Sequence, residues 1–258
     1  MTALRHVTFA ALLLSVSLPF AALHPLGRVT LDQPADQMGD NFEGDILLSD
    51  EQLAQMSKRT GMYLPTFIWP DRTVLYEIVS TDFTFEQTTA ITAAMRTIEQ
   101  HTCVRFVPAT VATVDFVRIS AGTGCSSFVG RIRGAQALRL QPSGVGTGCF
   151  TTGTIVHELI HALGFYHMQS ATERDQYVDI LWQNIVPGTE GNFQSYGTDR
   201  ILNYGVAYDY DSVMHYNTHA FSANGQPTIV PKAANVAIGQ RVAMSPGDIQ
   251  RIRNMYPC

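Results

Sequence analysis

Residues 157–167 read HELIHALGFYH, and this stretch decides how the rest of the sequence is interpreted. His157 and His161 are four residues apart, so on an α-helix both imidazoles leave the same face. Gly164 then permits the sharp turn that brings a third imidazole, His167, back towards the first two. Three neutral imidazole nitrogens converging on one point, with a fourth position left for water, are typical of a catalytic Zn²⁺ site.

Glu158 lies beside the first of these histidines, where its carboxylate can act on the water as a general base without binding the metal. The alternative interpretation is that the pattern arose by chance on an amphipathic helix, with histidines that only pack or face solvent. The glycine, the third histidine and the apolar residues before the motif argue against chance. The sequence therefore predicts a zinc enzyme whose reaction uses an activated water.

The first residues have the pattern of a secretory signal peptide over 1–22. Arg5 and His6 precede an apolar run at 7–18, and cleavage is expected near Ala22. The run is too short for a convincing membrane span, although a retained signal anchor is the alternative. We therefore expect a secreted, extracellular protein that is not held in a membrane.

Composition adds two constraints. A length of 258 residues permits one large domain or two small ones. The net charge of −5, with basic residues scattered rather than clustered, argues against nucleic acid as a partner. Four cysteines in a secreted chain are expected to form disulfides, and spacing alone leaves three pairings open. They are Cys103, Cys125, Cys149 and Cys258.

Residues 23–59 are polar and acidic, and they end in Lys58-Arg59. One interpretation is a disordered tail. The other is a propeptide that an activating protease removes at or near Arg59, and the zinc motif favours it because a secreted protease must stay inactive during synthesis. We therefore predict a propeptide over 23–59 and one catalytic domain over 60–258.

Local patterns predict a mixed α+β chain after residue 59. Runs rich in β-branched or apolar residues predict strands at 73–79, 104–107, 114–119 and 137–140. Apolar spacing predicts helices at 85–100 and 151–163, and a final helix that Ser245 begins. Thr152 or Thr154 is expected to cap the second helix. The residues between the last two helices are expected to be rich in loops.

Four stretches resemble the astacin-family zinc endopeptidases, which are metzincins. They are 154–175 (TIVHELIHALGFYHMQSATERD) for the active-site signature, 212–216 (SVMHY) for the Met-turn, 42–45 (FEGD) for the F-x-G-D motif of the propeptide, and 238–241 (IGQR) leading into MSPGD. The resemblance implies an α+β, zincin-like fold of two subdomains. The N-terminal subdomain would hold a twisted, mostly antiparallel sheet with two long helices, and the C-terminal one would be loop-rich with a terminal helix.

The resemblance also assigns roles to four residues. Met214 would pack beneath the zinc-binding imidazoles, and Tyr216 would be a fifth zinc ligand that swings away to stabilise the transition state. Asp45 would bind the zinc in place of the water and keep the zymogen inactive. Arg241 would line a pocket for an acidic residue after the scissile bond. Without this context Met214 and Tyr216 would be ordinary core residues, and Asp45 and Arg241 ordinary surface charges.

The resemblance further implies where the mature chain begins and how the cysteines pair. Its new N-terminus would be Thr60, nine residues before Trp69 and directly after the basic pair. The implied disulfides join two pairs: Cys103 with Cys258, and Cys125 with Cys149.

Three residues after His167 depart from the family pattern. Met168 stands where a glutamate is usual, Ala171 where an arginine is usual, and Glu173 where an aspartate is usual. That glutamate helps to anchor the amino terminus left after activation, and a methionine offers no charge and only a weak acceptor. We therefore expect the mature N-terminus not to be locked in the usual way, with the zinc ligands unaffected.

The sequence as a whole predicts a secreted, monomeric zinc endopeptidase that hydrolyses internal peptide bonds of proteins. Two alternatives remain. A non-catalytic binding protein on a protease scaffold would be expected to lack Glu158, which is present. A zinc enzyme that acts on a non-peptide bond is disfavoured by the resemblance of the propeptide motif and the Met-turn.

Overall fold

A computed structural model describes residues 35–39, 41–57, 67–198 and 202–258. The predicted signal peptide and the predicted cleavage site at Arg59-Thr60 lie outside these residues. Within them, the α-helices are α1 (Asp50–Ser57), α2 (Phe85–His101), α3 (Thr152–Leu163) and α4 (Pro246–Met255). The strands are β1 (Ile46–Leu47), β2 (Thr73–Ile78), β3 (Arg105–Pro108), β4 (Phe116–Ala121), β5 (Cys125–Phe128), β6 (Ala135–Leu140), β7 (Val178–Ile180) and β8 (Ile229–Pro231). Short 3-10 helices complete the description: η1 (Ala35–Met38), η3 (Pro70–Arg72), η4 (Gly148–Phe150), η5 (Met168–Ser170), η6 (Arg174–Gln176), η7 (Trp182–Asn184) and η8 (Glu190–Phe193).

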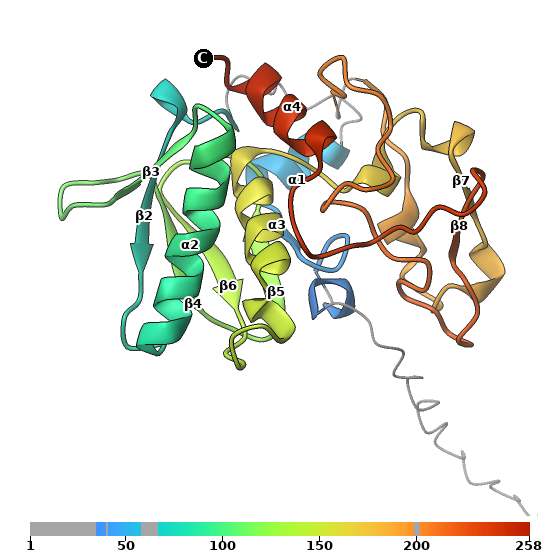
Figure 1. Cartoon of the computed structure of the whole chain (residues 1–258), viewed down its shortest axis with the longest axis horizontal. Helices are drawn as coiled ribbons and strands as arrows, with labels where there is room; N and C mark the ends of the chain where they lie inside the picture. The colour runs from blue at the N-terminus through green and yellow to red at the C-terminus, as the bar shows by residue number, and fades with distance from the viewer. Residues whose placement is uncertain (1–34, 40, 58–66, 199–201) are drawn as a thin grey trace, which may run out of the picture.

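The α+β architecture is confirmed, with two halves of different character. Six strands form one sheet in the order β1-β5-β6-β4-β2-β3, and α2 and α3 pack together on one of its faces (Figure 1). The other half is rich in loops, holds the two-stranded sheet β7-β8, and lies beside the end of α3 (Figure 1). No helix within the described residues combines the length and the apolar character needed to cross a membrane.

The expectation of a mostly antiparallel sheet is wrong. β2 pairs in parallel with both β3 and β4, β4 pairs in parallel with β6, and β1 pairs in parallel with β5. Only the β5–β6 ladder in this sheet of the described chain is antiparallel. For β2 and β3 the reason is the connection through α2, because a helix that crosses from β2 to β3 returns the chain to the same end of the sheet.

The ends of α3 position the metal motif. Thr151 caps the helix, rather than Thr152 or Thr154 as expected, because its hydroxyl accepts a hydrogen bond from the backbone N–H of Thr154 at 3.1 Å. Gly164 ends the helix with φ at 121°, and a Cβ there would lie 2.7 Å from the end of Met255. The turn that brings His167 towards α3 therefore favours glycine for its backbone angle, and a side chain there would also displace the flexible end of Met255.

Each half has its own hydrophobic core. Residues such as Ile98 and Leu159 fill the space between the sheet, α2, α3 and α4. Phe193 and Phe221 belong to a second cluster in the loop-rich half. All four cysteines are in disulfides, and these are the two pairs that the resemblance implies: Cys103–Cys258 and Cys125–Cys149.

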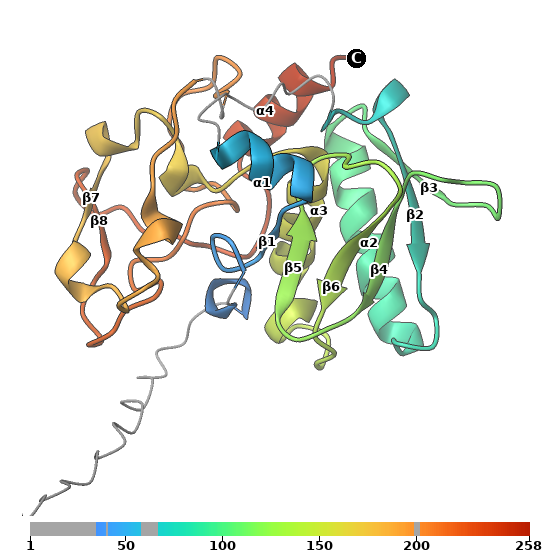
Figure 2. The ribbon, with the colours of Figure 1, turned by 180° about the vertical axis from the view of Figure 1, so that it is seen from behind.

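Residues 35–39 and 41–57, here called the N-terminal segment, lie between the two halves (Figure 2). β1 adds a strand to one edge of the six-stranded sheet, where Ile46 pairs with Ser127. The side chain of Gln52 on α1 donates a hydrogen bond to the carbonyl of Val129 at 2.8 Å. The segment is therefore built into the fold through backbone pairing and buried polar contacts.

Candidate metal centre

The three motif histidines converge as the sequence predicts. His157 and His161 project from the same face of α3, and His167 returns to them after the turn at Gly164. The Nε2 atom of His157 lies 3.1 Å from that of His161 and 3.3 Å from that of His167. Asp45 joins them from the N-terminal segment, with Oδ2 at 2.9 Å from Nε2 of His157. One ligand atom from each of these four buried residues lies within 4.8 Å of all the others.

The outward-facing ring nitrogens fix the tautomer of each histidine. In all three rings Nδ1 contacts an oxygen: His157 the carbonyl of Val213 (2.8 Å), His161 the carbonyl of Phe165 (2.7 Å), and His167 the Oε2 atom of Glu43 (2.7 Å). A carbonyl or carboxylate oxygen only accepts, so each Nδ1 carries a hydrogen and donates it. Every Nε2 lone pair is therefore left to point at the common centre.

This donor set fits a zinc ion. Tetrahedral zinc with Zn–N bonds of about 2.0–2.1 Å separates its ligand nitrogens by about 3.3 Å, close to the separations of the histidine pairs. Lone pairs and a carboxylate that face one another repel unless a cation lies between them. Burial by itself lowers the pKa of His167. The charge and hydrogen bond of Asp45, followed by those of Glu43, outweigh burial and raise that pKa to about 9. Burial and the charge of Arg241 shift the pKa of the neighbouring His157 the other way, to about 4, so a cation bound at the centre would have to displace a proton from His167.

Glu158 lies in the same buried region as the histidines. Burial raises the pKa of its carboxyl well above the usual range, and the negative charges of Asp45 and Asp36 add to this effect. Neither carboxylate oxygen has a hydrogen-bond partner among the described residues. A buried acid that no protein group satisfies has its proton-binding oxygens available to a reactant.

Arg241 lies next to the centre, where it is paired with a residue that the sequence did not single out. Asp36, on η1, is fully buried and accepts from Nη2 of Arg241 at 2.6 Å and from Nε at 3.1 Å. Burial by itself raises the pKa of Asp36, but Arg241 outweighs this and lowers it. Oδ2 of Asp36 is also 3.9 Å from Nε2 of His157, so the N-terminal segment reaches the arginine and the metal centre together.

Met214 and Tyr216 both lie buried in the turn at 212–216. The backbone N–H of Met168 donates to the carbonyl of Met214 at 2.9 Å, which joins the turn to the residue after His167. The Tyr216 ring lies 4.7 Å from the His167 ring, and its hydroxyl donates to the backbone carbonyl of Glu43. In this state the N-terminal segment therefore engages the tyrosine hydroxyl.

Asp248, on α4, holds the turn in place, and no local pattern predicted this role. Its Oδ1 atom accepts from the hydroxyl of Ser212 at 2.5 Å, and its Oδ2 atom accepts from the N–H of Val213 at 2.9 Å. The carbonyl of Val213 in turn accepts from His157. Asp248 is therefore connected to a metal ligand through one residue of backbone.

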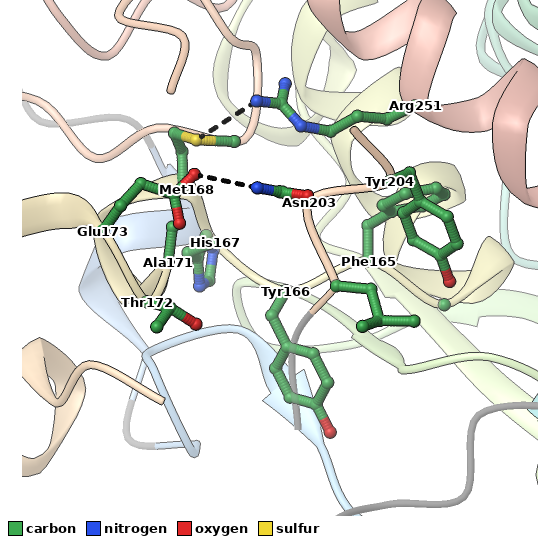
Figure 3. Close-up of a pocket in the computed structure, with 12 residues that line it drawn as sticks. Phe165, Tyr166, His167, Met168, Ala171, Thr172, Glu173, Asn203, Tyr204 and Arg251 are labelled. Atoms are coloured by element: carbon green, nitrogen blue, oxygen red, sulfur yellow. Dashed lines mark hydrogen bonds between the residues drawn. The ribbon is translucent and has the colours of Figure 1, made fainter. Parts of the chain in front are cut away.

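The residues that depart from the family pattern line a pocket beside His167 (Figure 3). The Met168 sulfur faces Arg251, whose Nη2 atom lies 3.8 Å away and donates to the carbonyl of Ala207 at 2.6 Å. Glu173 accepts from the side-chain amide of Asn203 at 3.5 Å. A buried arginine thus stands beside the methionine, with the carboxylate of Asp209 3.8 Å from its Nη1 atom, and Met168 itself offers no anionic partner to an ammonium group.

Comparison with known proteins agrees with this geometry. Residues 62–257 match the family model described as Astacin, a peptidase family. The chain belongs to the astacin family. The zinc metalloproteinase nas-15 of Caenorhabditis elegans is 38% identical over an alignment of 253 residues that covers 92% of this chain and 43% of that protein. Seminal metalloprotease 1 of Drosophila melanogaster is 39% identical over an alignment of 224 residues that covers 84% of this chain and 86% of that protein.

Solved structures show the same relationship. High choriolytic enzyme 1, a hatching enzyme zinc-protease of the medaka Oryzias latipes, matches with a TM-score of 0.69 and 39% identity. The match covers 76% of this chain and 97% of that structure. The chain spans less than half the length of the three nematode relatives nas-15, nas-14 and nas-13. Astacin metalloproteases use zinc, and the four-residue group of this chain suits one such ion.

Proposed function

We propose that this astacin-family chain is a secreted, monomeric zinc endopeptidase made as a zymogen. The observation that carries the proposal is the convergence of three Nε2 atoms and a carboxylate beside a buried glutamate that has no protein partner among the described residues. The printed names of the relatives, zinc metalloproteinases and a hatching enzyme zinc-protease, support hydrolysis of peptide bonds. The apolar run near the N-terminus supports secretion.

The chemistry assigns one step to each group. Bound zinc would supply a Lewis acid that polarises the scissile carbonyl and lowers the pKa of a water molecule. Glu158 takes the proton of that water on its carboxylate and later gives it to the leaving amine. The hydroxyl of Tyr216, once released from the carbonyl of Glu43, donates a hydrogen bond to the oxyanion that forms.

The N-terminal segment is proposed to keep the enzyme inactive by occupying three of its groups. Asp45 takes the coordination position that water needs, Asp36 pairs with Arg241, and the backbone of Glu43 holds the hydroxyl of Tyr216. Cleavage by an activating protease after Arg59 would allow the segment to leave. The buried Arg251 beside Met168 supports a mature N-terminus that is not locked in the usual way.

Arg241 is proposed to recognise an acidic side chain of the substrate. Its guanidinium already binds one carboxylate, that of Asp36, in a buried position next to the metal centre. Departure of the N-terminal segment would leave that cation without this partner and ready for an aspartate or glutamate of a protein substrate. Asp36 would then be the zymogen's internal counterpart of the substrate acid.

The test is proteolysis of casein by the chain trimmed to begin at Thr60. We expect cleavage that stops when a chelator removes the metal and returns when zinc is restored. The untrimmed chain, with Asp45 in place, is the matched control and should cleave much more slowly. Absence of chelator-sensitive cleavage by a trimmed chain that contains zinc would contradict the proposal.

A further inference from the structure

We propose that Glu43 is a positioning residue of the metal centre, whose carboxylate orients His167 for metal binding. The N-terminal segment would then hold zinc through two residues, Asp45 as a direct ligand and Glu43 through His167. This inference rests on the zinc site of the proposed function, but it does not depend on peptidase activity.

Both carboxylate oxygens of Glu43 are used inside the protein. The residue is fully buried, and Oε2 accepts from Nδ1 of His167 at 2.7 Å. Oε1 accepts from the hydroxyl of Ser170 at 2.8 Å. Ser170 belongs to η5, which follows His167 directly, so the glutamate connects the ligand with the element that continues from it. The carboxylate therefore fixes the ring plane of His167 as well as its tautomer.

The backbone around Glu43 holds the carboxylate in this position. Glu43 has a φ of 45°, and its carbonyl accepts from the hydroxyl of Tyr216. Gly44 follows with a φ of 81°, and a Cβ at Gly44 would lie 2.8 Å from the ring of Phe221. The chain thus turns tightly against the second half of the fold, which places Glu43 on His167 and Asp45 at the metal position.

The three histidines differ in where their outer partners come from. His157 and His161 donate to backbone carbonyls of the matched peptidase region, and these remain after any cleavage near residue 59. His167 donates instead to a carboxylate of the N-terminal segment. A charged acceptor makes a stronger hydrogen bond than a carbonyl and raises the basicity of the ring as a ligand. Removal of the segment would therefore take the outer hydrogen-bond partner from His167 alone and lower the basicity of that ring as a ligand.

The first experiment measures zinc affinity of the full chain by competition with a chromogenic chelator. Loss of an outer partner of a ligand histidine typically costs about 10–100-fold in metal affinity, and we expect this for Glu43→Ala. Glu43→Gln should fall between, because its amide oxygen still accepts from His167 but carries no charge. Glu51→Ala, which removes an exposed glutamate of α1 in the same segment, is the matched control and should keep the wild-type affinity.

The second experiment separates positioning from general loosening. In the zinc-loaded, ¹⁵N-histidine-labelled chain, the Nδ1–H signal of His167 should move upfield in Glu43→Ala, with those of His157 and His161 unchanged. Wild-type zinc affinity in Glu43→Ala and Glu43→Gln, or equal movement of all three signals, would overturn the inference. Neither measurement uses proteolysis. If the full chain shows both effects while the zinc-loaded chain that begins at Thr60 does not cleave casein, the proposed peptidase is refuted and Glu43 keeps its role. Glu43→Gln keeps the size of the side chain, so the inference can still be tested with this variant if Glu43→Ala does not fold.

Discussion

Glu158 is the residue on which the proposed reaction depends most directly. Its proposed role is to transfer protons, and its carboxylate oxygens have no hydrogen-bond partner among the described residues. Glu158→Gln in the chain that begins at Thr60 should therefore lower kcat/KM on casein by about 10²–10⁴-fold. The amide keeps the shape of the side chain, so zinc content should stay at one ion per chain. Atomic absorption on the same sample checks the metal. Activity near that of the unsubstituted enzyme would remove Glu158 from the mechanism.

Arg241 carries the prediction about specificity. Its hydrogen bonds to the carboxylate of Asp36 are charge-assisted, and such bonds contribute about 1.5–3 kcal/mol each, or roughly ten- to a hundredfold. Arg241→Ala should therefore lower cleavage before aspartate or glutamate by at least about tenfold, with less effect on other sites. A peptide library analysed by mass spectrometry measures this preference. Arg241→Lys, which keeps the charge, is the control, and an unchanged preference in Arg241→Ala would refute the pocket.

The sequence was most informative where neighbouring residues share one site. The spacing within 157–167 predicts the convergence of three imidazoles, because a helix and one turn bring them together without help from the rest of the chain. Asp36 and Glu43 were not predicted, because their partners lie 205 and 124 residues further along the sequence. An acidic residue in a polar segment gives no sign of a buried partner that far away. The family resemblance reached Asp45 only because its motif is local.

At the scale of elements, α4 supports the metal centre from a distance through its first turn. Asp248 completes the capping box with Ser245. It also accepts hydrogen bonds from Ser212 and Val213, and these bonds hold the turn behind His157. Asp248→Ala leaves these buried donors without an acceptor, so the free energy of unfolding should fall by about 2–3 kcal/mol. Zinc affinity should fall as well, because the carbonyl of Val213 orients His157.

Urea unfolding and chelator competition measure the two effects of that substitution. Gln250→Ala is the control on the exposed side of the same helix, and it should change stability by less than about 0.5 kcal/mol. Equal effects of the two substitutions would contradict the supporting role of Asp248.

The strands show where local patterns are insufficient. The predicted strands at 73–79 and 137–140 correspond to β2 and β6, whose apolar residues alternate or cluster in the usual way. β5 was not predicted, because its sequence CSSF places two buried serines, Ser126 and Ser127, where a core strand normally has apolar residues. The direction of pairing was also predicted wrongly. Strand direction depends on how connections cross the sheet, which no single strand encodes.

At the scale of the whole molecule, the two disulfides close chain loops of different length. Cys103–Cys258 spans 155 residues and Cys125–Cys149 spans 24. A simple chain-entropy account assigns the longer loop about 5 kcal/mol and the shorter one about 3.5 kcal/mol. Replacing both cysteines of the long loop by serine should therefore destabilise the protein more than replacing both of the short one. Urea unfolding of the two double variants measures this, and the reverse order would show that local packing outweighs loop closure.

The pairing of β1 with β5 has a consequence for the molecule after activation. The backbone N–H of Ser127 donates to the carbonyl of Asp45, so part of the sheet edge is capped by the N-terminal segment. If that segment dissociates on activation, as proposed, the amides of β5 along this edge would face solvent or an incoming chain. Amide hydrogen exchange at Ser127 should then accelerate, and the bare edge becomes available to any extended polypeptide, whether a substrate or another unfolded protein. During synthesis the same segment would act as an intramolecular chaperone, because it covers an edge that would otherwise promote aggregation.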